Sequence, residues 1–266
     1  MRQFLVGGIG TSDAGNWKMN GSQQLVREMA LALQAVETCK VVLAPPMPLL
    51  ASARSVFSSD VAIAAQNCSA EKSGAFTGET SVAVLHDIAV DWVILGHSER
   101  RALYLETDCI VADKVAFALA NAMHVIACIG ETLHERESGQ TVNVLTRQLN
   151  AILAKLTREE WIAEKRNRIV LAYGDCLCNI EPVWAIGTGK VATPEQAQET
   201  HQAIREWLKI NVSLQVAEET RILYGGSVSA QNCTALKALP DIDGFLVGGA
   251  SLKVPDFTKI CTSSKL

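Results

Sequence analysis

The stretch DWVILGHSERR, residues 91–101, carries the pattern that decides the fold of this chain. Residues 92–95 are apolar at every position, which is typical of a strand buried on both faces, as the strands of parallel sheets are. A polar and charged cluster, residues 97–101, follows at once. In barrels of parallel strands the active-site residues lie at the carboxyl ends of the strands. The stretch therefore predicts a buried parallel strand that ends at a candidate site.

Seven further apolar runs are similar to this one, and the set predicts a closed (β/α)8 barrel of the α/β class. They are FLVGG at 4–8, KVVLA at 40–44, VAIAAQ at 61–66, HVIACIG at 124–130, RIVLAY at 168–173, RILYGG at 221–226 and GFLVGG at 244–249. Helical patterns long enough to cross back over a sheet lie between them, at 23–37, 108–122, 141–156 and 195–208. An open, doubly wound sheet is the alternative, but that fold more often shows a glycine-rich fingerprint after its first strand.

Composition and charge narrow the possible partners. The chain has 266 residues, 48% of them apolar, and no linker rich in Pro, Gly or Ser divides it, so we expect residues 1–266 to form one domain. A formal net charge of -4 gives no positive field that would recruit nucleic acid or an anionic membrane surface. No apolar stretch reaches the roughly 18 residues of a membrane span. We therefore expect neither nucleic acid nor a membrane as a partner.

The eight cysteines are mostly scattered singly among apolar neighbours, as reduced core thiols usually are. Cys176 and Cys178 are separated by one residue, whereas redox and zinc motifs have two, and no second cysteine pair accompanies them. The sequence therefore predicts neither a structural disulfide nor a metal site.

Polar residues and glycines follow the predicted strands, and in a barrel they would meet at one mouth. Asn16 and Lys18 follow the first apolar run, and Glu181 lies beyond the sixth. The last two runs end in the glycine pairs 225–226 and 248–249. Without Cβ atoms, backbone N–H groups can approach a phosphate closely, and barrels commonly hold phosphate after these two strands.

Seven motifs occur in the order in which one enzyme family carries them. They are GNWKMNGS (15–22), GAFTGE (74–79), ILGHSERR (94–101), ACIGETL (127–133), EPVWAIGTGKVATPEQAQE (181–199), ILYGGSV (222–228) and GFLVGGASL (244–252). The motifs span the whole chain, and through them the sequence resembles the triosephosphate isomerase family. The resemblance implies glycolytic and gluconeogenic interconversion of dihydroxyacetone phosphate and D-glyceraldehyde 3-phosphate through an enediolate, without cofactor or metal. It also implies a homodimer in which Thr77 reaches the neighbouring subunit's active site.

The resemblance gives individual residues the roles established for the family. Glu181 would be the base that moves a proton between two substrate carbons, and His97 would polarise the carbonyl as a neutral imidazole. Lys18 would add positive charge beside the enediolate, with Glu99 as its buried ionic partner. The substrate-binding residues would be Asn16, Lys18, Gly187 of a closing lid, Ser227, Gly248 and Gly249.

Two inserts separate the chain from the family pattern. Residues 9–14, with one flanking glycine, lengthen the approach to Asn16 by seven residues, and residues 174–180 place seven more between Tyr173 and Glu181. Seven extended residues span about 23 Å, so the chain must either loop them out or slide them into the strand. The sequence leaves both open. The inserts also favour an alternative function, a catalytically impaired barrel with a binding or structural role.

The equal length of the two inserts suggests a common origin. Each can be encoded by 21 nucleotides bounded by GT and AG, and removal of either restores a family junction in frame. This leads to the hypothesis that both are unspliced miniature introns, absent from the working enzyme. Genuine insertions accommodated by strand slippage are the rival.

The chain ends in Ser264-Lys265-Leu266, a peroxisome-type targeting signal. We therefore expect import into a peroxisome-type organelle, the glycosome, with the cytoplasm as the alternative.

Overall fold

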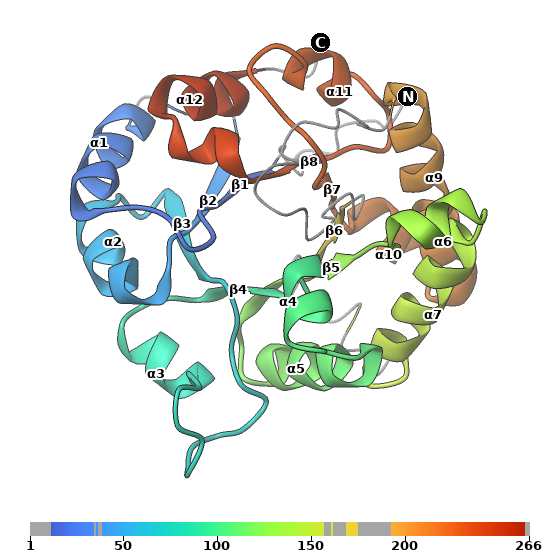
Figure 1. Ribbon diagram of the computed structural model, residues 1–266, viewed down its shortest axis with the longest axis horizontal. Coiled ribbons are helices and arrows are strands. Elements are labelled where there is room, and N and C mark those ends of the chain that lie inside the picture. The colour runs from blue at the N-terminus through green and yellow to red at the C-terminus, as the bar shows by residue number, and fades with distance from the viewer. Residues whose placement is uncertain are drawn as a thin grey trace.

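The computed structural model describes residues 12–34, 36, 39–156, 161, 169–174 and 193–263. Within them a parallel sheet closes into a barrel in the order β1 to β8, and helices surround it (Figure 1). The strands are β1 Ser12–Asn16, β2 Lys40–Ala44, β3 Val61–Ala65, β4 Trp92–Leu95, β5 His124–Ile129, β6 Ile169–Tyr173, β7 Ile222–Tyr224 and β8 Gly244–Val247. The predicted (β/α)8 TIM barrel is confirmed, and strands β2 to β8 lie within the predicted apolar runs.

The first strand differs from the prediction. Residues 12–16 form the first strand of the barrel, in place of the predicted run at 4–8, and residues 4–8 lie outside the described part of the chain. Ser12 pairs with Lys40 on one side and Gly244 on the other. All five residues of β1 are buried, although the strand contains a serine, an aspartate and an asparagine. The first insert therefore supplies part of the barrel wall, as the sliding alternative requires.

The sixth strand keeps its predicted position. Tyr173 is its last residue and pairs with Ile129 on β5 and Tyr224 on β7. Sliding the second insert into this strand would displace residues 169–173, and the structure does not show that displacement. The first insert thus supplies residues to β1, whereas residues 175–180 of the second insert lie outside the described part of the chain.

The helices and short 3-10 turns lie in the connections between strands. They are α1 Gln23–Leu33, η1 Met47–Leu49, α2 Leu50–Val56, α3 Val82–Asp87, α4 Ser98–Leu103, α5 Asp108–Ala120, α6 Leu133–Glu137, α7 Thr141–Leu153, α9 Pro194–Asn211, α10 Leu214–Glu219, α11 Cys233–Lys237, η3 Gly249–Leu252 and α12 Val254–Thr262. Thr193 caps α9 in a capping box with Gln196, ahead of a proline in the first turn. Among the described residues, none of these helices combines the length and apolar character needed to cross a bilayer.

The core has two layers. Side chains such as Ala14, Ile94 and Ile126 fill the inside of the barrel. A larger layer, which includes Leu43 and Phe257, lies between the strands and the surrounding helices. Burial on both faces explains why the strands are apolar at nearly every position. The barrel is thus a packed scaffold, and its chemistry must lie in the loops at the strand ends.

Candidate active site

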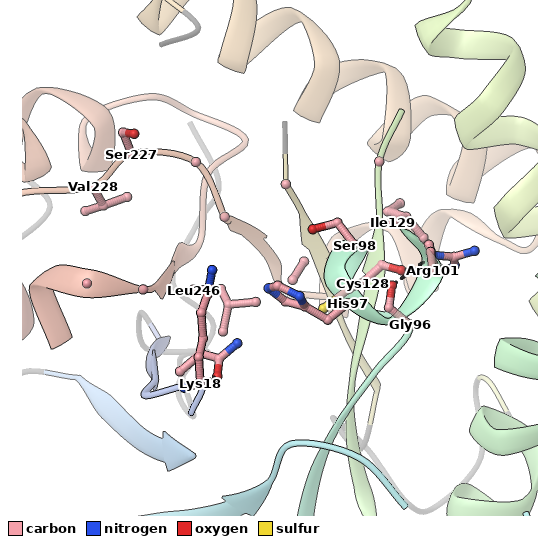
Figure 2. Close-up of a pocket in the computed structure, with 18 of the residues that line it drawn as sticks. Lys18, Gly96, His97, Ser98, Arg101, Cys128, Ile129, Ser227, Val228 and Leu246 are labelled. Atoms are coloured by element: carbon pink, nitrogen blue, oxygen red, sulfur yellow. Dashed lines mark hydrogen bonds between the residues drawn. The ribbon is translucent and has the colours of Figure 1, made fainter. Parts of the chain in front are cut away.

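A pocket of about 400 Å³ opens at the carboxyl ends of the strands. Figure 2 shows the side chains of Lys18 and His97 pointing into it, with Ser227 farther along its wall. Six of the predicted site residues line this pocket: Asn16, Lys18, His97, Ser227, Gly248 and Gly249. They come from four different strand ends, so the closed barrel brings together residues that are far apart in the sequence.

Lys18 is held in a strained backbone conformation at the end of β1. Its φ of 52° lies in the left-handed region, which costs a lysine conformational energy. The side-chain oxygen of Asn16 accepts a hydrogen bond from the Lys18 N–H at 3.0 Å, and the Gln66 amide donates to the Lys18 carbonyl at 2.9 Å. These two bonds fix the backbone from both sides, so that the ammonium group is directed into the pocket.

Glu99 is the ionic partner of Lys18, as expected. The distance between Lys18 Nζ and Glu99 Oε1 is 2.5 Å. The pair is not buried, which corrects the prediction: the two side chains retain 35% and 37% of their exposure. Water therefore reaches both side chains and screens their attraction. The pair therefore orients the ammonium group and adds little to the stability of the fold.

His97 caps the amino terminus of α4 through its ring. Its Nδ1 atom accepts a hydrogen bond from the Glu99 backbone N–H at 3.2 Å. Burial lowers the pKa of His97 from 6.5 to about 4; Glu99 opposes this shift and Lys18 adds to it. The imidazole is therefore neutral near pH 7. Because Nδ1 accepts a hydrogen bond, the ring proton is on Nε2, which makes the ring a neutral hydrogen-bond donor.

The glycine end of the pocket is open to a ligand. A Cβ atom on Gly249 would meet nothing within 4 Å, and one on Gly248 would approach only Lys18 Cε, at 3.8 Å. Gly248 precedes the short helix η3, and its carbonyl accepts from the Ser251 N–H at 2.8 Å. The Ser227 carbonyl accepts from the Asn232 amide at 2.8 Å. These contacts tie down two loops whose inner surface has room for a phosphate.

Besides Glu99, three predicted site residues do not line the described pocket. Glu181 and Gly187 lie outside the described residues, and Gly174, which follows β6 and lines the pocket, is the last residue described before them. Thr77 is exposed on the connection between β3 and α3, which projects from the barrel (Figure 1). It does not line the pocket of its own chain.

Two residues at the site were given no role by the sequence analysis. Gln66 donates to the carbonyls of Ala44 and Lys18, and so links β2 to the backbone of the lysine. Arg101 donates to the Gly96 carbonyl at 2.8 Å and pairs with Asp108 at 2.6 Å, which fixes the residue before His97. Gln66 ends the apolar run at 61–66 and Arg101 belongs to the polar cluster at 97–101, but the sequence gives no signal for their bonds to backbone carbonyls.

The barrel also contains a buried thiol at the pocket and, elsewhere, a cluster of side chains of metal-ligating types. Cys128 lines the pocket, and burial raises its pKa to about 12, so the thiol stays protonated and packed. In the described part of the chain, one group gathers three side chains of metal-ligating types, Asp13, Cys39 and Cys261. This group adjoins the amino-terminal ends of β1 and β2, away from the pocket. Cys176 and Cys178 lie outside the described residues.

Comparison with known proteins assigns the family. A sequence model of triosephosphate isomerase matches residues 13–264, nearly the whole chain. The chain belongs to the triosephosphate isomerase family. The match begins inside β1, in agreement with a first strand at residues 12–16.

Curated members of the triosephosphate isomerase family match over almost their full length. The cytosolic triosephosphate isomerase of Oryza sativa subsp. japonica is 48% identical, with 99% of this chain and 97% of the relative covered. The triosephosphate isomerase of Emericella nidulans is 49% identical, with 97% of each covered. The cytosolic triosephosphate isomerase of Stellaria longipes is 48% identical, with 98% of this chain and 96% of the relative covered.

These relatives correct the expectation about location. The triosephosphate isomerases of Oryza sativa and Stellaria longipes are named as cytosolic. Import into a glycosome or another peroxisome-type organelle, predicted from Ser264-Lys265-Leu266, is therefore wrong. A three-residue ending is read by a receptor and has no fold of its own, so it is weaker evidence than similarity along the whole chain.

Proposed function

We propose that this chain interconverts dihydroxyacetone phosphate and D-glyceraldehyde 3-phosphate by proton transfer through an enediolate. The observation that carries the proposal is the pairing of a neutral His97 with the Lys18 ammonium group, both in one pocket with an open glycine wall. Membership of the triosephosphate isomerase family supports the same reaction. No comparison favours the alternative of a catalytically impaired barrel with a binding or structural role.

The described groups suit the charge changes of this reaction. His97 would donate its Nε2 proton to the substrate carbonyl oxygen, whose negative charge grows as the enediolate forms. The Lys18 ammonium group would stabilise the same charge, and Asn16 would fix the Lys18 backbone and contact the substrate. Ser227, Gly248 and Gly249 would hold the phosphate, with hydroxyl and backbone donors. The proposed reaction needs no cofactor and no metal.

The remaining roles rest on family membership and the motif EPVWAIGTGK. Glu181 would be the base, and a carboxylate can take a carbon-bound proton at neutral pH only when it is positioned against the substrate and shielded from water. Gly187 would give the lid a backbone donor for the phosphate. Closure of the lid would keep water from the enediolate.

We also propose that the chain forms a single domain and that two chains form a homodimer. Residues 1–266 would form a single barrel, which agrees with β1 starting at Ser12 and α12 ending at Thr262.

A homodimer is supported by the projecting connection that carries Thr77, because exposed apolar side chains lie on it and beside it. Phe76 on the connection is 46% exposed, and Met47, which contacts Thr80, is 42% exposed. Sedimentation of the wild type and of Thr77→Arg tests it: the variant should sediment as a monomer.

A coupled assay of isomerase activity tests the reaction. His97→Gln and Lys18→Met should each reduce kcat/KM by at least about 100-fold, because each removes a group that meets developing charge. His134→Gln is the matched control, since His134 is exposed and does not line the pocket. A folded wild-type chain without isomerase activity would overturn the proposal in favour of a non-catalytic barrel.

A further inference from the structure

Two thiols meet at the end of the barrel away from the catalytic mouth. Cys39 precedes β2, and Cys261 lies in the last turn of α12. Their sulfur atoms and a carboxylate oxygen of Asp13 all lie within 4.8 Å of one another. Cys39 Sγ also donates to the Cys261 carbonyl at 3.2 Å across a separation of 222 residues. The proposed isomerase reaction uses neither thiol.

The surroundings of Asp13 argue against a metal ion at this place. Asp13 Oδ2 pairs with Lys237 Nζ at 2.8 Å, and Asp13 Oδ1 accepts from the Phe245 N–H at 3.2 Å. Both carboxylate oxygens are thus occupied, and the Lys237 ammonium group would repel a cation. Two thiols alone are fewer ligands than a tetrahedral zinc site needs. The reactive groups of this cluster are therefore the two thiols, Cys39 and Cys261.

The two cysteines differ in accessibility. Cys39 is partly exposed, whereas Cys261 is buried. Contact with Cys39 and burial raise the pKa of Cys261 well above its ordinary value, so that thiol stays protonated. A small oxidant therefore meets Cys39 first, and Cys261 is the neighbour placed to react with the product.

We propose that Cys39 and Cys261 form an intramolecular disulfide when the protein is exposed to a peroxide. The Cys39 thiolate attacks one peroxide oxygen and the O–O bond breaks, which gives a sulfenic acid and hydroxide. The hydroxide takes up the proton that Cys39 lost and becomes water. The Cys261 sulfur then attacks the Cys39 sulfur, and the sulfenic oxygen leaves with the Cys261 proton as a second water. Two thiols are oxidised by two electrons, and one hydrogen peroxide is reduced to two waters.

The bond would join the start of β2 to the last helix of the barrel. It would close a loop of more than 200 residues, and such a cross-link restricts the unfolded chain strongly. Its site lies at the end of the strands opposite to Lys18 and His97. We therefore expect the oxidised protein to unfold at a higher temperature and to keep its isomerase activity.

The test treats the folded full-length protein with hydrogen peroxide, blocks remaining thiols with iodoacetamide and maps the peptides without reduction. The expected product is a peptide pair joined through Cys39 and Cys261, which dithiothreitol separates. The midpoint of thermal unfolding should rise by about 5–10 °C on oxidation and fall again on reduction. Cys109→Ser, which removes an exposed free thiol, is the matched control and should still form the cross-link.

Three outcomes would overturn the proposal. One is a wild-type peptide map in which Cys109 is oxidised while Cys261 is fully alkylated. Another is a Cys39→Ser variant that shows the same rise in unfolding temperature on oxidation. The third is a zinc ion bound at one equivalent that protects both thiols from iodoacetamide, which would make the cluster a metal site. The peptide map uses the wild type, so the test does not depend on the folding of a variant or on isomerase activity.

Discussion

Lys237 Nζ lies 2.8 Å from Asp13 Oδ2, and neither side chain has any exposure to solvent. The pair links α11 to β1, and Asp13 belongs to the insert that the family pattern lacks. Burial raises the pKa of Asp13 above its ordinary value, and attraction to Lys237 offsets part of that rise. The remaining contacts of the ammonium group are longer, 3.4 Å to the Ile260 carbonyl and 3.5 Å to Ser263 Oγ. Asp13 is thus the main partner of a fully buried lysine.

The buried pair should show strong coupling in a double-mutant cycle. Lys237→Met alone should lower the free energy of unfolding by about 3–5 kcal/mol, because it leaves the Asp13 charge buried without a partner. Asp13→Val alone should cost a similar amount. The double variant should recover most of the loss, since two apolar side chains replace two charges. Urea unfolding of the four proteins measures this, and simple additivity of the two losses would show that the pair is not coupled.

Deletion of residues 9–15 tests whether the first insert belongs to the working protein. The deletion would bring residues 5–8 next to Asn16 and place Val6 at the strand position of Asp13. Lys237 would then lose its main partner, so we expect lower thermal stability, restored when Lys237→Met accompanies the deletion.

The miniature-intron hypothesis predicts the opposite result. The deleted protein would then be more stable and more active than the 266-residue chain, without any change at Lys237. Deletion of residues 174–180, which follow β6 in the sequence, is the companion experiment. Sequencing the mature transcript decides independently, because segments that persist in it are not introns.

The low pKa of His97 predicts a pH-dependent contribution to stability. The folded value of about 4 lies below the ordinary 6.5, so the unfolded chain binds the proton first as the pH falls. The contribution of neutral His97 is therefore complete above pH 6.5 and is lost between pH 6.5 and 4, by up to about 3 kcal/mol. The difference in unfolding free energy between the wild type and His97→Gln, measured from pH 8 to 4, should fall by that amount. A constant difference would mean that His97 titrates normally.

Glu181→Asp should lower kcat by about 100-fold or more and leave the fold intact. The shorter side chain retracts the carboxylate by one methylene, and a displacement of this size misplaces a catalytic base. Circular dichroism and thermal unfolding check the fold, and the coupled assay measures turnover. Unchanged turnover would remove Glu181 from the proposed mechanism.

Gln66 should act on activity through Lys18. Gln66→Leu keeps the size of the side chain but removes its bonds to the Lys18 and Ala44 carbonyls. The strained lysine backbone should relax, and kcat/KM should fall by about 10-fold. In a Lys18→Met background the same change should have no further effect on kcat/KM. An equal loss in both backgrounds would show that Gln66 does not position Lys18.

Much of the site was visible in the sequence because its chemistry lies next to strand ends. His97 and Lys18 follow strands at the mouth, and the structure places both in one pocket. The half-exposed state of Glu99 and the low pKa of His97 were not visible, because each depends on how much water the surrounding loops admit. The contacts of Gln66 and Arg101 with backbone carbonyls were not visible for a different reason: every residue has a backbone carbonyl, so the sequence does not show which one accepts the bond.

The sequence by itself determined seven strands, the helix start at Thr193 and the closed barrel, since burial on both faces demands continuous apolar runs and capping demands local residue types. The tertiary structure alone decided the first strand. The run at 4–8 is the more apolar candidate, yet the barrel uses residues 12–16. Local hydrophobicity cannot show that Asp13 contacts Lys237, which is 224 residues away. Nor can it show that the strand must end where Asn16 and Lys18 reach the pocket. A charged residue becomes a core residue only when the fold supplies its partner.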